Sequence, residues 1–260
     1  MWHQKPPLGS LLNTAHPLAR SLVGAWLFNE GSGDIAINSA NSASNGQLGS
    51  TVTWCPGGIK FSDTYDDANS RIGCGDALNP SAQNWEGVSF VSKYYHYPGG
   101  YPVLIANVNN STEVGNFYAV PHAVSGFLWK GPSQYILMPL SKKNVYTVAG
   151  TWNAADGKIA LYVDGKQAVS DTKTGSWTTN YDTIIGGMTK YGTWRTLQDE
   201  LYYILLYSRA LTAAEIASLY VDPYQMFEAV PIWMMYQTAA GGLSIPRPLS
   251  RPLSGPLGGI

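Results

Sequence analysis

Two Asp-Gly pairs within one short stretch constrain the fold of this 260-residue chain more than any other feature. The stretch AGTWNAADGKIALYVDGK, residues 149–166, places apolar residues on both sides of Asp156-Gly157 and ends with Asp164-Gly165. A two-residue hairpin turn needs positive φ angles at both positions, and Asp-Gly adopts them readily. We therefore predict two strands joined by a tight turn at Asp156-Gly157, with the second strand entering another turn at Asp164-Gly165.

Other strand-like runs recur along the chain, with turn residues between them. They cover residues 88–97, 101–108, 145–152, 158–163 and 201–207. One helix is predicted at residues 212–220, because Thr212 and Glu215 form a T-x-x-E capping box and Pro223 follows soon after. Many short strands with little helix favour a two-sheet β-sandwich.

Three segments carry a resemblance to a known family: LVGAWLFNEGSG at residues 22–33, the double turn at 149–166, and SRALTAAEIASLY at 208–220. They resemble laminin-G-like domains, which have the concanavalin A-like jelly roll and are used mostly for binding. The resemblance covers about residues 21–222. It implies an all-β, two-sheet antiparallel jelly-roll sandwich with one short C-terminal helix. Residues 1–20 are then an extended lead-in, and residues 223–260 an aromatic, Met-rich and Pro-rich arm.

Composition argues against two classes of partner. Sixteen basic and seventeen acidic residues give a net charge of −1 with no basic cluster, so we expect no nucleic-acid binding. The longest apolar run is about seven residues, too short to span a bilayer, so we expect no membrane insertion.

Residues 1–20 have no apolar core of signal-peptide length, which predicts synthesis in a cytoplasm without export. In that reducing compartment Cys55 and Cys74 are expected to be free.

Catalytic patterns are missing from the sequence. It has no phosphate-binding loop and no zinc-protease motif, and its histidines are scattered: His3, His16, His96 and His122. Glycosidases of this fold carry two carboxylates that point into one groove from one strand. Here Asp199 and Glu200 are adjacent, so a strand would send them to opposite faces. We therefore expect that the chain is not an enzyme.

The resemblance implies a structural calcium ion beside the loop after the first strand, with Glu30, Asn38 and Asp199 at the corresponding positions. Asn38 stands where the family usually has a carboxylate. Calcium prefers six to eight oxygen ligands, so the loss of a charged ligand weakens the site. The alternative is that Glu30 and Asp199 tie a loop to the sheet through backbone N–H groups. No other cofactor is predicted.

Carbohydrate binding is common in this fold and uses aromatic side chains on a concave face or on loops. The segment KYYHYPGGY, residues 93–101, is the best candidate, because its Pro-Gly-Gly turn would expose it. The predicted glycan-contacting residues are Tyr94, Tyr95, Tyr97 and Tyr101. The alternative is that these tyrosines belong to the core or to an interface.

The segments HPLARSLVGAWLFNEGSG (16–33) and DPYQMFE (222–228) resemble bacteriophage-encoded proteins of this fold. We therefore predict a structural and binding protein of a virus particle, capsid-decorating or tail-associated, with a glycan-binding surface. It would be located in the virion after synthesis in the host cytoplasm. The alternatives are a lectin-like module at a cell surface, which the missing export signal disfavours, and a glycan-cleaving enzyme.

Both terminal segments are expected to pack on other virion proteins or on copies of the chain. Aromatic and Met side chains concentrate interface energy, and an RPLS repeat with Pro at every fourth position favours polyproline II. The predicted interface anchors are Phe227, Trp233, Met235, Leu249, Leu253 and Leu257. The alternative is that residues 230–236 form a further strand of the sandwich.

Overall fold

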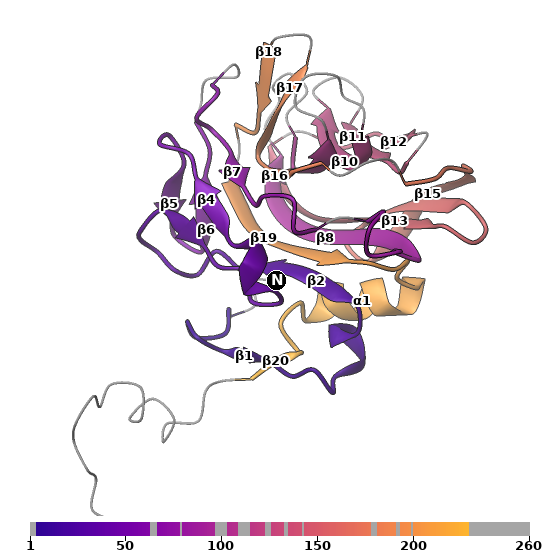
Figure 1. Cartoon of the computed structure of the whole chain (residues 1–260), viewed down its shortest axis with the longest axis horizontal. Coiled ribbons are helices and arrows are strands. Elements are labelled where there is room, and N and C mark those ends of the chain that lie inside the picture. Colours follow the sequence, from indigo (N-terminus) through magenta and orange to yellow (C-terminus); the bar gives the residue numbers. More distant parts are fainter. Residues whose placement is uncertain are drawn as a thin grey trace, which may run out of the picture.

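Two antiparallel sheets packed face to face form the body of the protein (Figure 1). The computed structural model describes residues 4–62, 67–78, 80–96, 103–108, 115–122, 126–132, 135–141, 143–177, 181–190, 193–198 and 200–228. The first sheet has the order β15-β14-β13-β8-β19-β6-β5, with β2 also paired to β19. The second has the order β12-β11-β10-β9-β16-β7-β4-β3. The predicted two-sheet jelly roll is confirmed.

The first sheet contains β2 (Leu22–Trp26), β5 (Thr53–Cys55), β6 (Gly58–Lys60), β8 (Gly87–His96), β13 (Asn144–Asn153), β14 (Lys158–Val163), β15 (Lys166–Thr172) and β19 (Glu200–Tyr207). The second contains β3 (Ile35–Ala36), β4 (Gly46–Leu48), β7 (Ile72–Gly73), β9 (Ile105–Val108), β10 (Gly115–His122), β11 (Gly126–Lys130), β12 (Tyr135–Met138) and β16 (Thr183–Ile185). Two ribbons pair β1 (Leu11–Leu12) with β20 (Phe227–Glu228), and β17 (Gly187–Lys190) with β18 (Thr193–Thr196). The helical segments are η1 (Pro17–Ala19), η2 (Ser42–Ser44) and α1 (Ala213–Val221).

One of the two predicted tight turns is confirmed and the other is longer than predicted. Asp164 and Gly165 have φ angles of 47° and 77° and join β14 directly to β15. At the other turn only Gly157 has a positive φ, 68°, and the strands stop at Asn153 and Lys158. The Asn153 side chain accepts a hydrogen bond from the backbone N–H of Ala155, at 3.0 Å. This local bond stabilises a wider turn that the Asp-Gly signal alone does not reveal.

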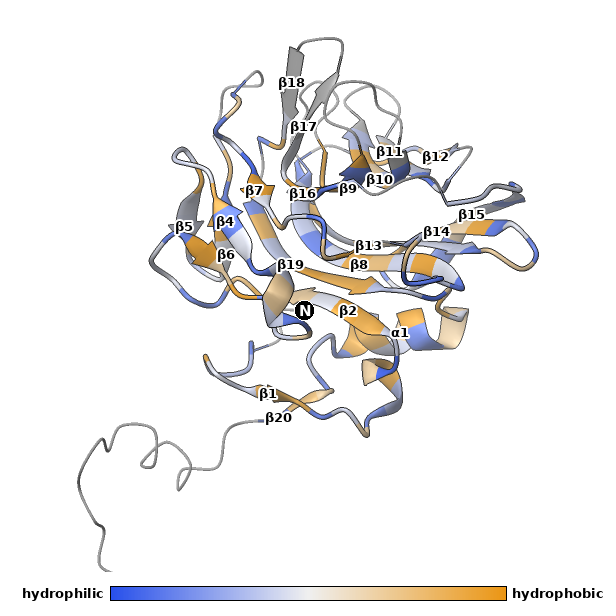
Figure 2. Cartoon of the chain, in the orientation of Figure 1, coloured by the Kyte–Doolittle hydropathy of each residue, from blue (hydrophilic) through white to orange (hydrophobic). Residues whose placement is uncertain are grey.

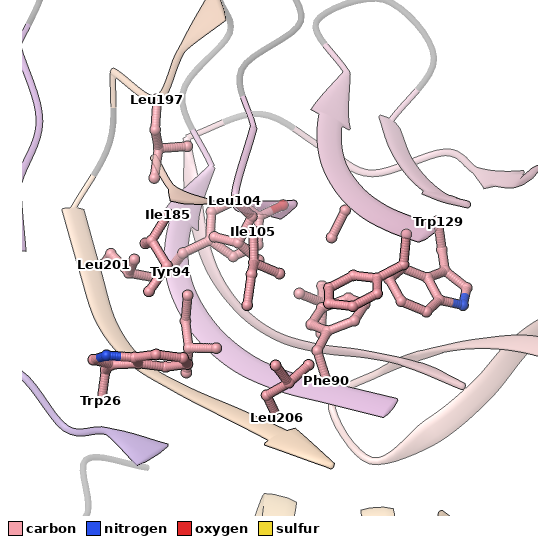
Figure 3. Close-up of a cluster of buried hydrophobic side chains, with 14 of the residues drawn as sticks. Trp26, Phe90, Tyr94, Leu104, Ile105, Trp129, Ile185, Leu197, Leu201 and Leu206 are labelled. Carbon is pink, nitrogen blue, oxygen red and sulfur yellow. The ribbon is translucent and has the colours of Figure 1, made fainter. Parts of the chain in front are cut away.

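The core lies between the sheets and is built from aromatic rings. Trp26, Phe90 and Trp129 are fully buried there, and the rings of Phe90 and Trp129 lie 4.9 Å apart (Figure 3). Gly150 of β13 makes this contact possible. A Cβ at this position would lie 2.4 Å from Phe90 and 2.7 Å from Trp129, so any other residue would displace the rings.

The outer face of the first sheet is covered as well. Helix α1 lies beneath β2 and β19 in Figure 1, with the β1–β20 ribbon beyond it. A second apolar cluster joins this helix, the lead-in and the sheet through Leu18, Leu205, Ile216, Leu219 and Met226. Central strands buried on both faces need near-continuous apolar sequences, and apolar colour runs along β2, β8 and β19 in Figure 2.

The described residues of both terminal segments pack on their own chain in this outer cluster. For these residues, the prediction that the terminal segments pack on neighbouring subunits is corrected. Leu12 pairs with Phe227, and the backbone N–H of Asn13 donates to the carbonyl of Met226 at 2.9 Å. Both segments bury apolar side chains against the sheet of their own chain, because its outer face would otherwise be exposed to water. Phe227 packs against this cluster too. The other proposed interface anchors lie outside the described residues: Trp233, Met235, Leu249, Leu253 and Leu257.

Helix α1 begins where the capping box predicts. Thr212 is its N-cap: its side chain accepts from the N–H of Glu215, and the Glu215 carboxylate accepts from the N–H of Thr212. Arg209 adds a two-pronged ion pair to the same carboxylate, at 2.6 and 3.0 Å. Burial raises the pKa of Glu215, but the hydrogen bonds from Arg209 and Thr212 outweigh it and place the pKa below its usual 4.5.

Cys55 and Cys74 are free, as expected.

Replacing Glu215 by Gln should destabilise the protein by about 1 kcal/mol at neutral pH, because it removes the ion pair and weakens the cap. A carboxylate whose folded pKa is depressed contributes stability above its unfolded pKa and loses it as pH falls through the folded value. The difference between wild type and Glu215→Gln should therefore shrink below about pH 4.5. Urea unfolding across this range measures it, with exposed Glu86→Gln as the control. A pH-independent difference would contradict the prediction.

Candidate functional site

A cleft of about 620 Å³ opens on the outer face of the first sheet, where the cover by helix α1 and the lead-in is incomplete. Its floor is formed by β8, β13 and β19, and the end of α1 forms one wall. The lining residues are Lys5, Gly57, Lys93, Val145, Thr147, Asp164, Tyr202, Tyr203, Tyr220, Val221, Pro223 and Tyr224. An apolar cleft with a few polar groups is the usual form of a small-molecule site.

The polar groups of the floor form a row across neighbouring strands. Lys93 lies opposite Thr147 on one side and opposite Tyr203 on the other. Asp164 extends the row, because its carboxylate accepts from the N–H of Thr147 at 3.0 Å. Burial lowers the pKa of Lys93, and the Asp164 carboxylate opposes that shift. The row thus presents an ammonium donor and a carboxylate acceptor side by side.

Tyrosines provide the apolar part of the cleft. The rings of Tyr203 and Tyr224 meet edge to face with centroids 5.6 Å apart, and burial raises the pKa of both phenols. Tyr220, on the last turn of α1, is 38% exposed at the rim. It lies against Gly165, where a Cβ would come within 2.9 Å of it. The tight turn and the helix end therefore position one exposed aromatic ring over the cleft.

A β-bulge in β19 gives the cleft two consecutive tyrosines. Leu201 pairs with Tyr94 and Tyr203 with Lys93, so Tyr202 is an extra residue on its strand. Both Tyr202 and Tyr203 belong to the outer cluster, although adjacent residues of a regular strand would face opposite sides. The Tyr202 hydroxyl donates to Glu200 at 2.9 Å. Burial raises the pKa of this phenol, and the hydrogen bond to Glu200 raises it further.

Lys5 closes the other end of the cleft. Its ammonium donates to the carbonyl oxygens of Leu27, of Phe28 at 3.1 Å and of Tyr202 at 2.5 Å. Burial lowers the pKa of Lys5 to about 7, and the Glu30 carboxylate opposes the shift. The lead-in is fixed beside it, because Asn29 donates to the carbonyl of Pro6 at 2.9 Å.

The structure separates the tyrosines predicted to contact glycans. Tyr94 points into the core between the sheets (Figure 3) and is completely buried, which corrects its assignment as a glycan contact. Tyr95 faces outward and is half-buried, opposite Val145 of the cleft. Tyr97 and Tyr101 lie outside the described residues. The period of two along β8 puts Lys93 and Tyr95 on the outer face, a signal already present in the sequence.

The predicted calcium ligands are engaged in protein hydrogen bonds. The Asn38 side-chain oxygen accepts from the N–H groups of Ala25, Ala40 and Asn41, which corrects its assignment as a ligand. Glu30 accepts from the N–H of Ile37 through one oxygen, as the alternative interpretation expected, while its buried second oxygen has no hydrogen-bond partner. Calcium needs six to eight oxygens, so these two residues do not fit it by themselves. Asp199 lies outside the described residues, and calcium binding stays a prediction.

Among the described residues, no three or more His, Cys, Asp or Glu side chains gather closely enough to hold a metal ion. No helix in that part of the chain is long and apolar enough to cross a membrane.

Comparison with known proteins supports the class that the fold defines, a concanavalin A-like lectin/glucanase-type domain. Residues 98–217 match the family model of the concanavalin A-like lectin/glucanases superfamily. No curated protein matches the sequence. The matched segment includes most of the cleft floor and the start of α1.

Solved structures with the same fold have diverse functions. Trypanosoma rangeli sialidase in complex with sialic acid matches with a TM-score of 0.61 and 16% identity, covering 80% of this chain and 34% of the sialidase. The botulinum neurotoxin type G receptor binding domain matches at 0.58 and 13%, covering 78% and 51%. The binding domain of paraclostridial mosquitocidal protein 1 matches at 0.61 and 14%, covering 80% and 53%. The chain thus spans about a third of the sialidase and about half of each toxin domain.

These matches overturn the prediction that the chain is not an enzyme. The prediction relied on a missing glycosidase carboxylate pattern, yet the fold also occurs within sialidases. At this identity the likeness shows the fold alone. Because one fold carries both catalytic and binding proteins, neither the fold nor one missing motif excludes an enzyme.

The opposite orientations of Tyr94 and Tyr95 predict unequal effects of truncation. Tyr94→Ala should destabilise the protein by about 3–5 kcal/mol, because it empties a packed core position. Tyr95→Ala should cost about 1 kcal/mol or less, because its side chain is half exposed. Urea unfolding of the two variants measures the difference. Equal effects would show that the assigned faces of β8 are wrong.

Proposed function

We propose that the protein binds a glycan in the outer-face cleft. The observation that carries this proposal is the combination of exposed Tyr220 at the rim with the Lys93–Asp164 row on the floor. Aromatic rings pack against the apolar C–H faces of a sugar ring, and charged groups bind its hydroxyls by hydrogen bonds. The lectin-like fold and its occurrence in the binding domains of toxins support the proposal.

The polar groups and the aromatic rings of the cleft would make different contacts with a sugar. The hydrogen bond from Thr147 holds the Asp164 carboxylate, and strand pairing holds the backbone of Lys93 beside Thr147, so the carboxylate is positioned before a ligand arrives. Preformed polar groups cost little ordering entropy on binding. Tyr220 and half-buried Tyr95 offer ring surface at the edge of the same face. The cleft is therefore suited to one or two sugar units rather than to a long chain.

Glycan-array screening followed by calorimetry with the best glycan tests this function. Tyr220→Ala and Lys93→Met should each weaken binding about tenfold or more, equivalent to about 1.4 kcal/mol. Tyr135→Ala is the matched control, because this tyrosine is 58% exposed on β12 of the other sheet. Binding that tolerates both cleft variants would place the glycan elsewhere. A complete lack of glycan binding would contradict the function.

We also propose a more specific role, as a component of a bacteriophage particle that is made in the host cytoplasm. The support is the resemblance of residues 16–33 and 222–228 to phage-encoded proteins, together with the RPLS repeat that follows. In this role residues 229–260 attach the sandwich to other virion proteins or to further copies. The described terminal residues do not share that task, because they pack on their own chain.

Deletion of residues 243–260 tests the attachment role. The truncated chain should keep its melting temperature, because the outer cluster ends at Phe227, but it should no longer co-purify with the particle. Light scattering of the isolated protein and particle sedimentation measure the two properties. Unchanged attachment after deletion would rule out the proposed role of the segment.

A further inference from the structure

The cleft runs across the strands of the first sheet. Its floor passes from Asp164, which follows β14, to Thr147 on β13, Lys93 on β8 and Tyr203 on β19, and these strands are neighbours in that order. Neighbouring strands lie about 4.8 Å apart, so the floor from β14 to β19 spans about 14 Å. A ligand that follows the polar row therefore lies perpendicular to the strands.

At the β19 end, the cleft meets the side chain of Lys5. Its ammonium donates to the carbonyl of Phe28 at 3.1 Å and to that of Tyr202 at 2.5 Å, so the lysine reaches from the lead-in to the ends of two strands. The hydrogen bond from Asn29 to the carbonyl of Pro6, at 2.9 Å, holds the lead-in beside it. This end of the cleft is therefore closed by a side chain that is fixed in the folded protein.

At the β14 end, the rim is formed by Tyr220. Its ring is 38% exposed and lies against the turn residue Gly165. Among the described residues of the lead-in, 4–20, only Lys5 lines the cleft, so the lead-in does not close this second end. A ligand longer than the floor can leave past Tyr220 but not past Lys5.

The outer face of the sheet continues beyond Lys5 with polar side chains. There β19 is followed by β6 and β5, and the Tyr202 hydroxyl donates to Glu200 at 2.9 Å. Burial raises the pKa of the Cys55 thiol, the charge of Glu200 raises it further, and the charge of Lys5 opposes both. These groups lie close together on the side of Lys5 where a longer glycan would otherwise continue.

We propose that Lys5 makes the cleft specific for the end of a glycan chain, with the terminal sugar stopping against Lys5 and the rest of the chain leaving past Tyr220. This inference rests on the function proposed above and names the class of glycan that the cleft takes. A groove open at both ends holds any stretch of a chain. A groove closed at one end excludes internal stretches, because one of their sugars would clash with the closing side chain.

The test compares one sugar motif in two positions. Linear oligosaccharides of two to six units carry the best-binding disaccharide of the array either at a free end or as an internal unit with sugars on both sides. In calorimetry, wild type should bind the terminal form about tenfold or more tightly than the internal form. Lys5→Ala should reduce this preference to about twofold or less, mainly by gaining affinity for the internal form, because the closed end is opened. Lys158→Met should keep the wild-type preference, because its side chain is 77% exposed.

Two results would overturn the proposal while leaving glycan binding in the cleft intact. One is equal binding of the two forms by wild type, with both still weakened by Tyr220→Ala. The other is a preference for the terminal form that folded Lys5→Ala keeps in full, which would assign the preference to other residues. Binding that Tyr220→Ala does not weaken, or no binding of any glycan, would contradict the proposed function as well.

The wild-type comparison needs no variant, so it covers the case in which Lys5→Ala does not fold. Asn29→Ala gives a second variant, because it releases the lead-in at Pro6 and leaves all cleft-lining side chains unchanged. It should reduce the preference for chain ends about two- to threefold, with circular dichroism to verify its fold. An unchanged preference in folded Asn29→Ala would contradict the role of the lead-in.

Discussion

Burial of both faces of β8, β13 and β19 is the constraint on which the rest of the structure depends. The inner face packs on the aromatic rings of the second sheet, and the outer face packs on α1, the lead-in and residues 224–227. Strands in this position need side chains that are apolar on both faces, as in the sequence YYILLY of β19. The termini are therefore part of the packed body of the molecule.

The cleft follows from incomplete cover of that outer face. Where α1 ends, the sheet changes from apolar side chains to the row of Asp164, Thr147 and Lys93, which can face water. The bulge in β19 adds Tyr202 to Tyr203 on the same side. Polar anchors, tyrosine rings and a rigid floor thus meet at one place because a strand irregularity coincides with the edge of a helix.

The lead-in is joined to the first sheet by a lysine that donates hydrogen bonds to backbone carbonyls. Where β19 changes partner from β6 to β2, the Lys5 ammonium donates hydrogen bonds to the carbonyl oxygens of Leu27, Phe28 and Tyr202. A lysine from the lead-in thus joins the ends of β2 and β19 at one end of the cleft. Fold stability and cleft shape are linked through this one side chain.

Much of the fold was determined by local sequence. The capping box placed α1, the Asp164-Gly165 pair placed a tight turn, and apolar runs located the central strands, because these signals act over a few residues. Other features depended on distant contacts. The buried Tyr94, the bulge at Tyr202 and the contacts of Lys5 with the strand ends arise from how β19 meets β2, β6 and β8. Only the tertiary structure decided them, because ladder register and partner changes join segments that are nearly two hundred residues apart.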